Sequence, residues 1–138
     1  MKYWDNGSQA IKIFMTLMDT LIKDEDISQK MKPMDQLIWY DFTQDGPEFS
    51  YWIDTRNDNL ICGPGEPEEK PNVAVSMSLD TGHRFYSNKI NPLMAMAKGQ
   101  IKLKGSATSL LKLTPLSKAI AVFYNQILED LKFDEIKI

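Results

Sequence analysis

The spacing of apolar residues predicts helices at both ends of the chain. Residues 8–23 place apolar side chains at the three- and four-residue spacing of a helix, with Ser8 as the expected N-cap. A short helix should follow over 25–31 and end before Pro33. The apolar stripe of the first helix is wider than a surface helix needs. This helix therefore either sinks into the core or lines a ligand cavity.

Strands are predicted between these helical regions. Residues 36–43 and 49–54 alternate inward and outward side chains, and with 60–62 they form an antiparallel meander whose first turn is Asp45-Gly46. Residues 73–77 and 101–104 show the same alternation. Short helices are expected near 80–85, 93–97 and 106–113, and the last helix should place its apolar face against the core over about 116–131.

Length and composition fit one intracellular domain. A chain of 138 residues can bury a single core, and we expect residues 1–138 to form one unit. The lone cysteine, Cys62, excludes an internal disulfide and suits a reducing compartment. No apolar run has the form of a signal peptide or the length of a membrane span. We therefore predict a cytoplasmic protein.

The net charge of −3 hides a segregation of charge along the chain. Residues 1–80 carry −8, whereas residues 81–128 contain no acid and seven basic residues: Arg84, Lys89, Lys98, Lys102, Lys104, Lys112 and Lys118. If the first six of these cluster, they should contact anionic membranes; otherwise they are scattered solvated positions. The acidic chain has no exposed aromatic residues on its basic strand, so no nucleic-acid partner is expected.

The chain offers little catalytic or metal-binding chemistry. His83 and Cys62 are the only histidine and cysteine, which excludes a tetrahedral zinc site built from those two residue types. A Cys62–His83 nucleophile pair would fit an acyl-transfer enzyme or thioesterase, but we expect a structural cysteine and a solvated helical histidine. No phosphate-binding glycine motif or catalytic triad is present. We predict that the protein is not an enzyme and uses no cofactor or metal.

The stretch from residue 72 to 115 resembles the sterol carrier protein family. It reads NVAVSMS, then Lys-Ile-Asn-Pro over 89–92, then MAMAKGQIKLKG and LLKLTPL. These four linked elements stand in the family's order and spacing, while residues 36–62 agree with the family only in pattern. Asn88 stands where the family usually has glycine, and both residues tolerate a left-handed backbone.

The resemblance implies an α+β fold in which a five-stranded, mostly antiparallel sheet is covered by helices and encloses an apolar tunnel. The implied function is non-catalytic binding and transfer of a fatty acid, fatty acyl-CoA, phospholipid or sterol-like lipid. Eight methionines suit an irregular apolar ligand. The residues expected to line the tunnel are Phe14, Leu17, Met18, Leu21, Phe85, Met94, Met96, Leu110, Leu113 and Phe123.

The alternative is an accessory or regulatory subunit with the same fold. The helix over 115–131 looks longer than the usual family ending. It would either cover one mouth of the tunnel or serve as the interface with a partner, including a second copy in a homodimer.

Overall fold

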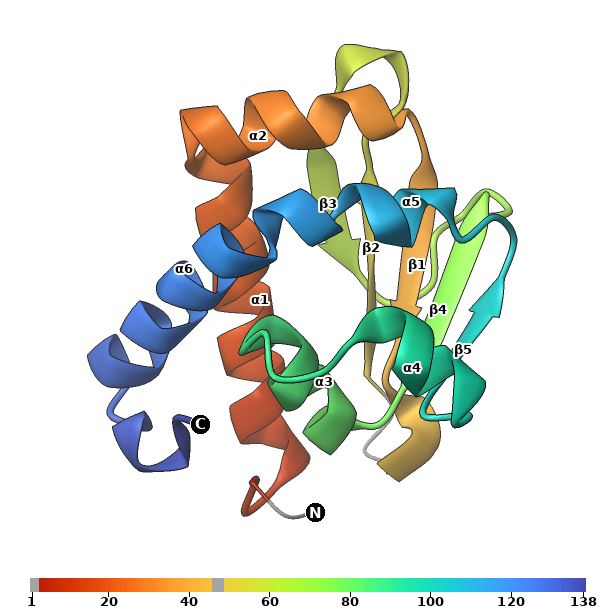
Figure 1. Cartoon of the computed structure of the whole chain (residues 1–138). Helices are drawn as coiled ribbons and strands as arrows, with labels where there is room; N and C mark the ends of the chain where they lie inside the picture. Colours follow the sequence, from red (N-terminus) through yellow and green to blue (C-terminus); the bar gives the residue numbers. More distant parts are fainter. Residues whose placement is uncertain (1–2, 46–48) are drawn as a thin grey trace.

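One five-stranded sheet carries the fold. The computed structural model describes residues 3–45 and 49–138, but not the side chains of Asp45, Ser109 and Leu110, so the expected Asp45-Gly46 turn lies outside the described residues. The strands are β1 Leu37–Asp41, β2 Ser50–Asp54, β3 Ile61–Pro64, β4 Val73–Met77 and β5 Ile101–Lys104, in the order β3-β2-β1-β4-β5 (Figure 1). Only the β1–β4 pair is parallel. The α+β class and the mostly antiparallel sheet are confirmed.

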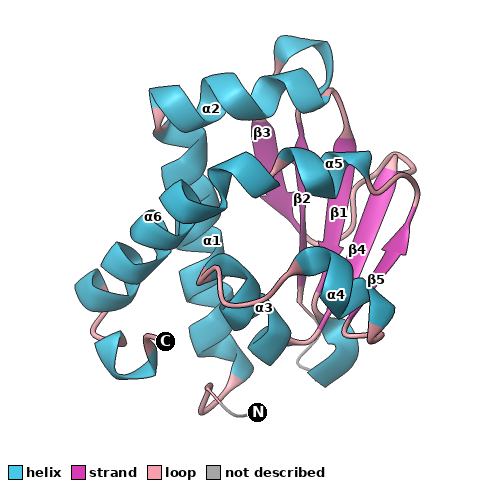
Figure 2. Ribbon diagram, in the orientation of Figure 1, coloured by secondary structure: helices cyan, strands magenta, loops and turns pink. Residues whose placement is uncertain are grey.

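The helices lie on one side of this sheet (Figure 2). They are α1 Gly7–Lys23, α2 Glu25–Met31, α3 Leu79–Tyr86, α4 Pro92–Ala97, α5 Thr108–Lys112 and α6 Ser117–Asp130. The strands alternate accordingly: Tyr40, Tyr51 and Val75 share a register and are buried against the helices. Trp39 and Ala74 share the opposite, helix-free face.

Helix starts follow capping chemistry, but the caps of α1 and α3 differ from those expected: Ser78, rather than Asp80 or Thr81, precedes α3. Asn6, not Ser8, caps α1: its backbone is extended and its side-chain oxygen accepts a hydrogen bond from the Gln9 amide at 3.3 Å. Asp24 caps α2 in the same way through the Ile27 amide at 2.9 Å. Ser78 caps α3 through the Thr81 amide at 3.0 Å.

The centre of the core is aromatic, and Phe14 of α1 occupies it. Its ring centroid lies 5.1 Å from those of both Phe42 and Tyr86. Helix α3 approaches closely because residue 82 is glycine: a Cβ there would lie 2.7 Å from Phe42 Cε1. Without a Cβ at this position, α3 packs directly against the rings of Phe14 on α1 and of Phe42, which follows β1.

His83 is buried, so the expectation of a solvated histidine was wrong. Its side chain is 0% exposed. Nδ1 lies 2.7 Å from the Tyr124 hydroxyl on α6, and Nε2 lies 2.8 Å from the Ile136 carbonyl oxygen near the C-terminus. These contacts satisfy both nitrogens and tie the chain's last turns to α3, a pairing across more than forty residues that the local sequence does not reveal.

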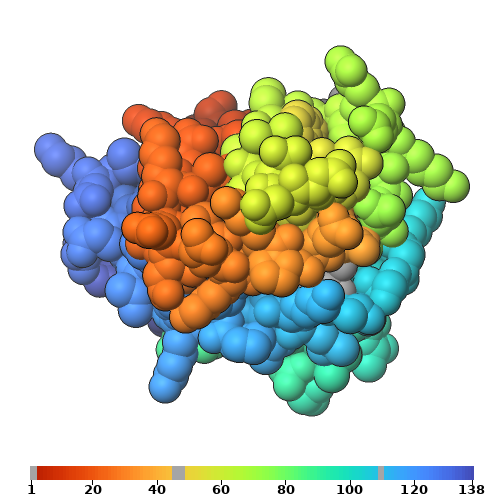
Figure 3. Space-filling model, turned by 90° about the horizontal axis from the view of Figure 1, so that it is seen from above, coloured from red at the N-terminus to blue at the C-terminus, as the bar shows by residue number. Residues whose placement is uncertain are grey.

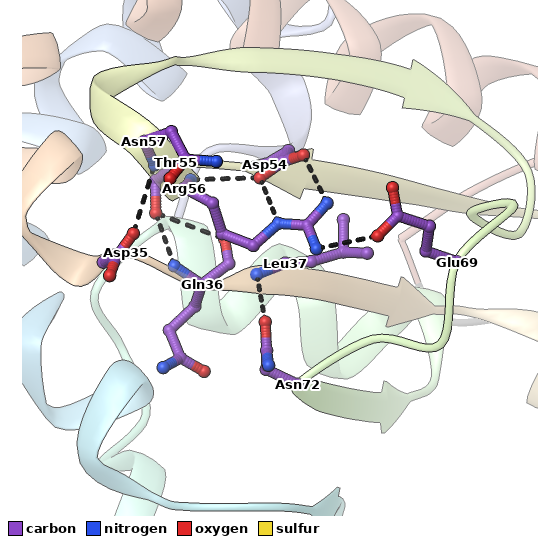
Figure 4. A network of polar contacts seen from close by, with 9 residues as sticks. All are labelled: Asp35, Gln36, Leu37, Asp54, Thr55, Arg56, Asn57, Glu69 and Asn72. Atoms are coloured by element: carbon purple, nitrogen blue, oxygen red, sulfur yellow. Dashed lines mark hydrogen bonds and ion pairs between the residues drawn. The ribbon is translucent and has the colours of Figure 1, made fainter.

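A polar network fixes the end of the sheet at which β1 and β4 begin and β2 ends (Figure 4). The Arg56 guanidinium donates to both carboxylate oxygens of Asp54, at 2.9 and 2.8 Å, and to Glu69 at 3.0 Å. The Asn72 side chain accepts from the Leu37 amide at 2.8 Å. Hydrogen bonding to Arg56 lowers the pKa of Asp54. This network anchors the loop between β3 and β4 to the sheet.

Within the described ranges, no helix combines the length and apolar content that crossing a bilayer requires.

Candidate functional site

An apolar cavity lies between the sheet and the helices. Six elements build it: α1, α2, the inner faces of β1 and β2, the end of α3, and the start of α6 with the turn before it. The lining residues are Met18, Leu21, Met31, Tyr40, Tyr51, Ile53, Phe85, Tyr86, Leu113, Ser117 and Ile120.

The cavity is small in this structure, with a free volume of about 30 Å³. A single buried water needs roughly 10–15 Å³ on this measure, so there is room for about two waters and not for an acyl chain. The expected open tunnel is therefore not seen. A lipid requires the walls to separate.

Four of the ten residues expected to line a tunnel meet at this cavity: Met18, Leu21, Phe85 and Leu113. Phe14 and Leu17 are fully buried but belong to the core behind it. Met96 and Phe123 are partly buried against the core, away from the cavity lining. Met94 is 57% exposed, because the six-residue α4 buries only Ala95. The side chain of Leu110 lies outside the described residues.

The sheet side of the cavity was missed by the sequence-based expectation. Tyr40, Tyr51 and Ile53 occupy inward positions on β1 and β2. The period-two alternation already predicts that these positions face the covering helices, so the signal was available. The cavity is also lined by Tyr86, Ser117 and Ile120. The direction in which these side chains point depends on how α3 and α6 are rotated about their own axes.

The lining contains no charged side chain. Its polar side chains are those of three tyrosines and Ser117. Burial raises the pKa of Tyr40 and of Tyr86, so both are neutral at physiological pH. The cavity therefore presents an apolar wall with uncharged hydrogen-bonding groups.

The start of α6 separates the cavity from an open groove on the surface. This groove runs between the turn over residues 88–92 and the segment over residues 114–118. Ser117 lines both the groove and the cavity, and Lys89 and Lys118 flank the groove. Seen from above, α2 (orange) and the segment from α5 to α6 (blue) lie next to each other (Figure 3).

Cys62 and His83 do not form the nucleophile pair considered above. Both ring nitrogens of His83 are engaged with Tyr124 and Ile136. Burial, and to a lesser extent Asp19, raise the pKa of the Cys62 thiol, which disfavours the reactive thiolate.

The sequence profile of the SCP-2 sterol transfer family matches residues 14–118, about three quarters of the chain. The chain belongs to the SCP-2 sterol transfer family. The match includes most of the cavity lining and ends at the second residue of α6. Membership supports a lipid ligand in broad terms.

Individual relatives and structures agree with this assignment. A hydroxysteroid dehydrogenase-like protein 2 from Xenopus laevis is 36% identical over 75 residues, which cover 54% of this chain but only 18% of that protein. Among solved structures, the apo sterol carrier protein 2 of Yarrowia lipolytica superposes with a TM-score of 0.62 at 20% identity, covering 92% of this chain and 98% of that one. Sterol carrier protein domain 2 of Helicoverpa armigera gives 0.64 at 22% identity, covering 80% and 87%. These two structures show the shared fold.

Proposed function

We propose that the protein binds a hydrophobic ligand between its sheet and its helices, carries out no catalysis, and exchanges that ligand with membranes. The observation that carries the proposal is the uncharged cavity that shares Ser117, the first residue of α6, with a surface groove. Each methylene removed from water contributes about 0.8 kcal/mol, so a ten-carbon chain contributes roughly 8 kcal/mol. Association and the opening of the walls offset part of this gain.

The segment from α5 to the start of α6 is the part of the wall that we expect to move. Leu113 and Leu116 are buried, whereas Leu111, Lys112, Thr114 and Pro115 are exposed. Because few of the segment's described side chains are buried, it opens at low free-energy cost. Moving it outward would join the cavity to the groove at Ser117.

A blocking variant and a matched control test the proposal. Ser117→Phe places a ring between cavity and groove, while Val122→Phe adds a ring to the same helix at a position that is 70% exposed. Each protein is incubated with vesicles of a natural lipid extract, re-isolated, and weighed by native mass spectrometry. We expect retained lipid in the wild type and in Val122→Phe, and little in Ser117→Phe. An absence of lipid from the wild type, or equal retention in both variants, would contradict the proposal.

We further propose that the groove side meets anionic membranes. The basic residues do not all serve this surface: Lys102 and Lys104 pair with Ser76 and Ala74 on the helix-free face of the sheet. Lys89 and Lys118 instead flank the groove, and among the described residues neither is in an ion pair. Next to the groove, Leu93 and Met94 on α4 are more than half exposed. Such apolar residues beside lysines suit an anionic lipid surface.

Two double variants separate the basic faces. A lysine near an anionic surface contributes about 1 kcal/mol, so Lys89→Ala with Lys118→Ala should weaken vesicle binding about 30-fold. Lys102→Ala with Lys104→Ala removes the same charge from the opposite face and should change binding little. Sedimentation with phosphatidylserine-containing vesicles at 50 and 300 mM salt measures both. Equal losses in the two variants, or binding that salt does not weaken, would contradict this docking face.

The subunit alternative receives less support. Helix α6 packs Tyr124, Ile127 and Leu128 toward α1 and α3 within the same chain, and its first turn covers the cavity. The face expected to bind a partner is thus used internally. Cytoplasmic residence remains part of the proposal, and a homodimer through α6 belongs to the alternative.

A further inference from the structure

The sheet-side wall of the cavity carries hydrogen-bonding groups that the fold itself does not use. Tyr40 on β1 and Tyr51 on β2 are direct cross-strand partners, with ring centroids 5.1 Å apart in a stacked arrangement. Tyr86 at the end of α3 completes the group, and the three side chains are at most 5% exposed. Within the described part of the chain, the hydroxyls of Tyr51 and Tyr86 are fully buried and have no hydrogen-bond partner.

The unpaired hydroxyls of Tyr51 and Tyr86 lower the stability of the folded protein. A buried hydroxyl without a partner destabilises a folded protein, and phenylalanine would fill the same space without that cost. The neighbouring Tyr124 shows the ordinary solution, because its hydroxyl is hydrogen-bonded to His83 at 2.7 Å. The cavity tyrosines differ: both line the cavity, and their hydroxyls are buried there without a partner, so a ligand reaches them by parting the walls. Two unpaired donors at one cavity point to a partner that the cavity receives.

We propose that Tyr51 and Tyr86, with Tyr40 beside them, form a polar subsite that binds an uncharged oxygen group, a hydroxyl or a carbonyl, on an otherwise apolar ligand. This inference rests on the proposed function and specifies the ligand class for that site. A carboxylate or phosphate does not fit at this depth, because no cation lines the cavity to offset its desolvation. Anionic groups would instead remain at the groove beside Lys89 and Lys118.

Three probes of similar length test the subsite. Decan-1-ol and undecan-2-one carry an oxygen group, whereas 1-chlorodecane has neither a hydroxyl nor a carbonyl. Their affinities are measured by displacement of a fluorescent apolar dye. The double variant Tyr51→Phe with Tyr86→Phe keeps both rings and removes both hydroxyls. Tyr124→Phe is the control, because it removes a hydroxyl that lies outside the cavity lining and already has a partner.

We expect the double variant to lose about 5- to 10-fold in affinity for decan-1-ol and undecan-2-one per hydroxyl lost, with no loss for 1-chlorodecane. Tyr124→Phe should leave the ratio of these affinities unchanged. An unchanged ratio in the double variant, with all probes still bound, would overturn the subsite and leave the lipid-binding proposal intact. Failure of every probe to bind the wild type would instead overturn the proposed function.

A second readout needs no ligand. Without a probe, Tyr51→Phe and Tyr86→Phe should each match or exceed the thermal stability of the wild type, whereas Tyr124→Phe should fall below it. Destabilisation of the two cavity variants by as much as the control would show that bound water already pairs their hydroxyls, and the subsite would then be a water site only.

Discussion

Acidification should weaken the fold through His83. A carbonyl oxygen can only accept, so Nε2 carries the proton donated to Ile136 and Nδ1 accepts from the Tyr124 hydroxyl. The neutral imidazole thus satisfies every contact. Burial is the largest influence on the pKa of His83 and lowers it below the ordinary 6.5, against smaller opposing effects of Ile136 and Asp80.

The sign and size of the effect follow from this shift. In the unfolded chain His83 takes up a proton near pH 6.5, whereas in the folded protein it stays neutral until a lower pH. Between these pH values the unfolded state binds more protons. The free energy of unfolding therefore has its full value above pH 6.5 and decreases as the pH drops toward the lowered pKa of folded His83. If folded His83 stays neutral down to pH 5.5, the free energy of unfolding decreases by about 1 kcal/mol between pH 6.5 and 5.5. This decrease corresponds to about 4 °C in melting temperature.

The assay compares melting temperatures of the wild type and His83→Gln from pH 7.5 to 5.5. Glutamine keeps a donor toward the Ile136 carbonyl but does not titrate, and carboxylates contribute equally to both proteins. We expect the wild type to lose more than the variant between pH 6.5 and 5.5, by up to about 4 °C. Parallel curves would refute the reasoning, whatever the variant's absolute stability.

Two further predictions concern packing and motion. Gly82→Ala should destabilise the protein by about 1–3 kcal/mol in urea unfolding, because the added Cβ would meet Phe42 at 2.7 Å; a stabilised variant would show that helix propensity outweighs this contact. In hydrogen exchange, the backbone amides of α5 and residues 114–116 should exchange faster than those of β1, and decan-1-ol should slow them. Protection by decan-1-ol confined to β5 would place the moving wall elsewhere.

The sequence predicted the strands and most helices because their signals are local. Alternation placed Tyr40 and Tyr51 inward, and Asn91-Pro92 marked the start of α4, which runs over Pro92–Ala97. The resemblance of residues 72–115 predicted the family that the match over 14–118 then showed. These features need only neighbouring residues or a known order of elements.

The site depended on placements that no local pattern contains. Phe14, Met18 and Leu21 share one face of α1, but the surroundings of that face change along the helix: Phe14 meets the aromatic core, while Met18 and Leu21, one and two turns further on, line the cavity. Likewise, Lys89 and Lys102 belong to one acid-free segment, yet one flanks the groove and the other lies on the helix-free face. Where each helix turn lies over the sheet, and the order of the strands, decide these outcomes.

The central claim, a ligand between sheet and helices, can be tested with methionine methyl signals in NMR. Met18 and Met31 line the cavity, Met34 is buried away from it, and Met94 is exposed on α4. Titration with decan-1-ol should shift the methyl resonances of Met18 and Met31 and leave that of Met34 in place. A shift of Met94 alone, or no shift at Met18 and Met31 at saturating decan-1-ol, would contradict a binding site at this cavity.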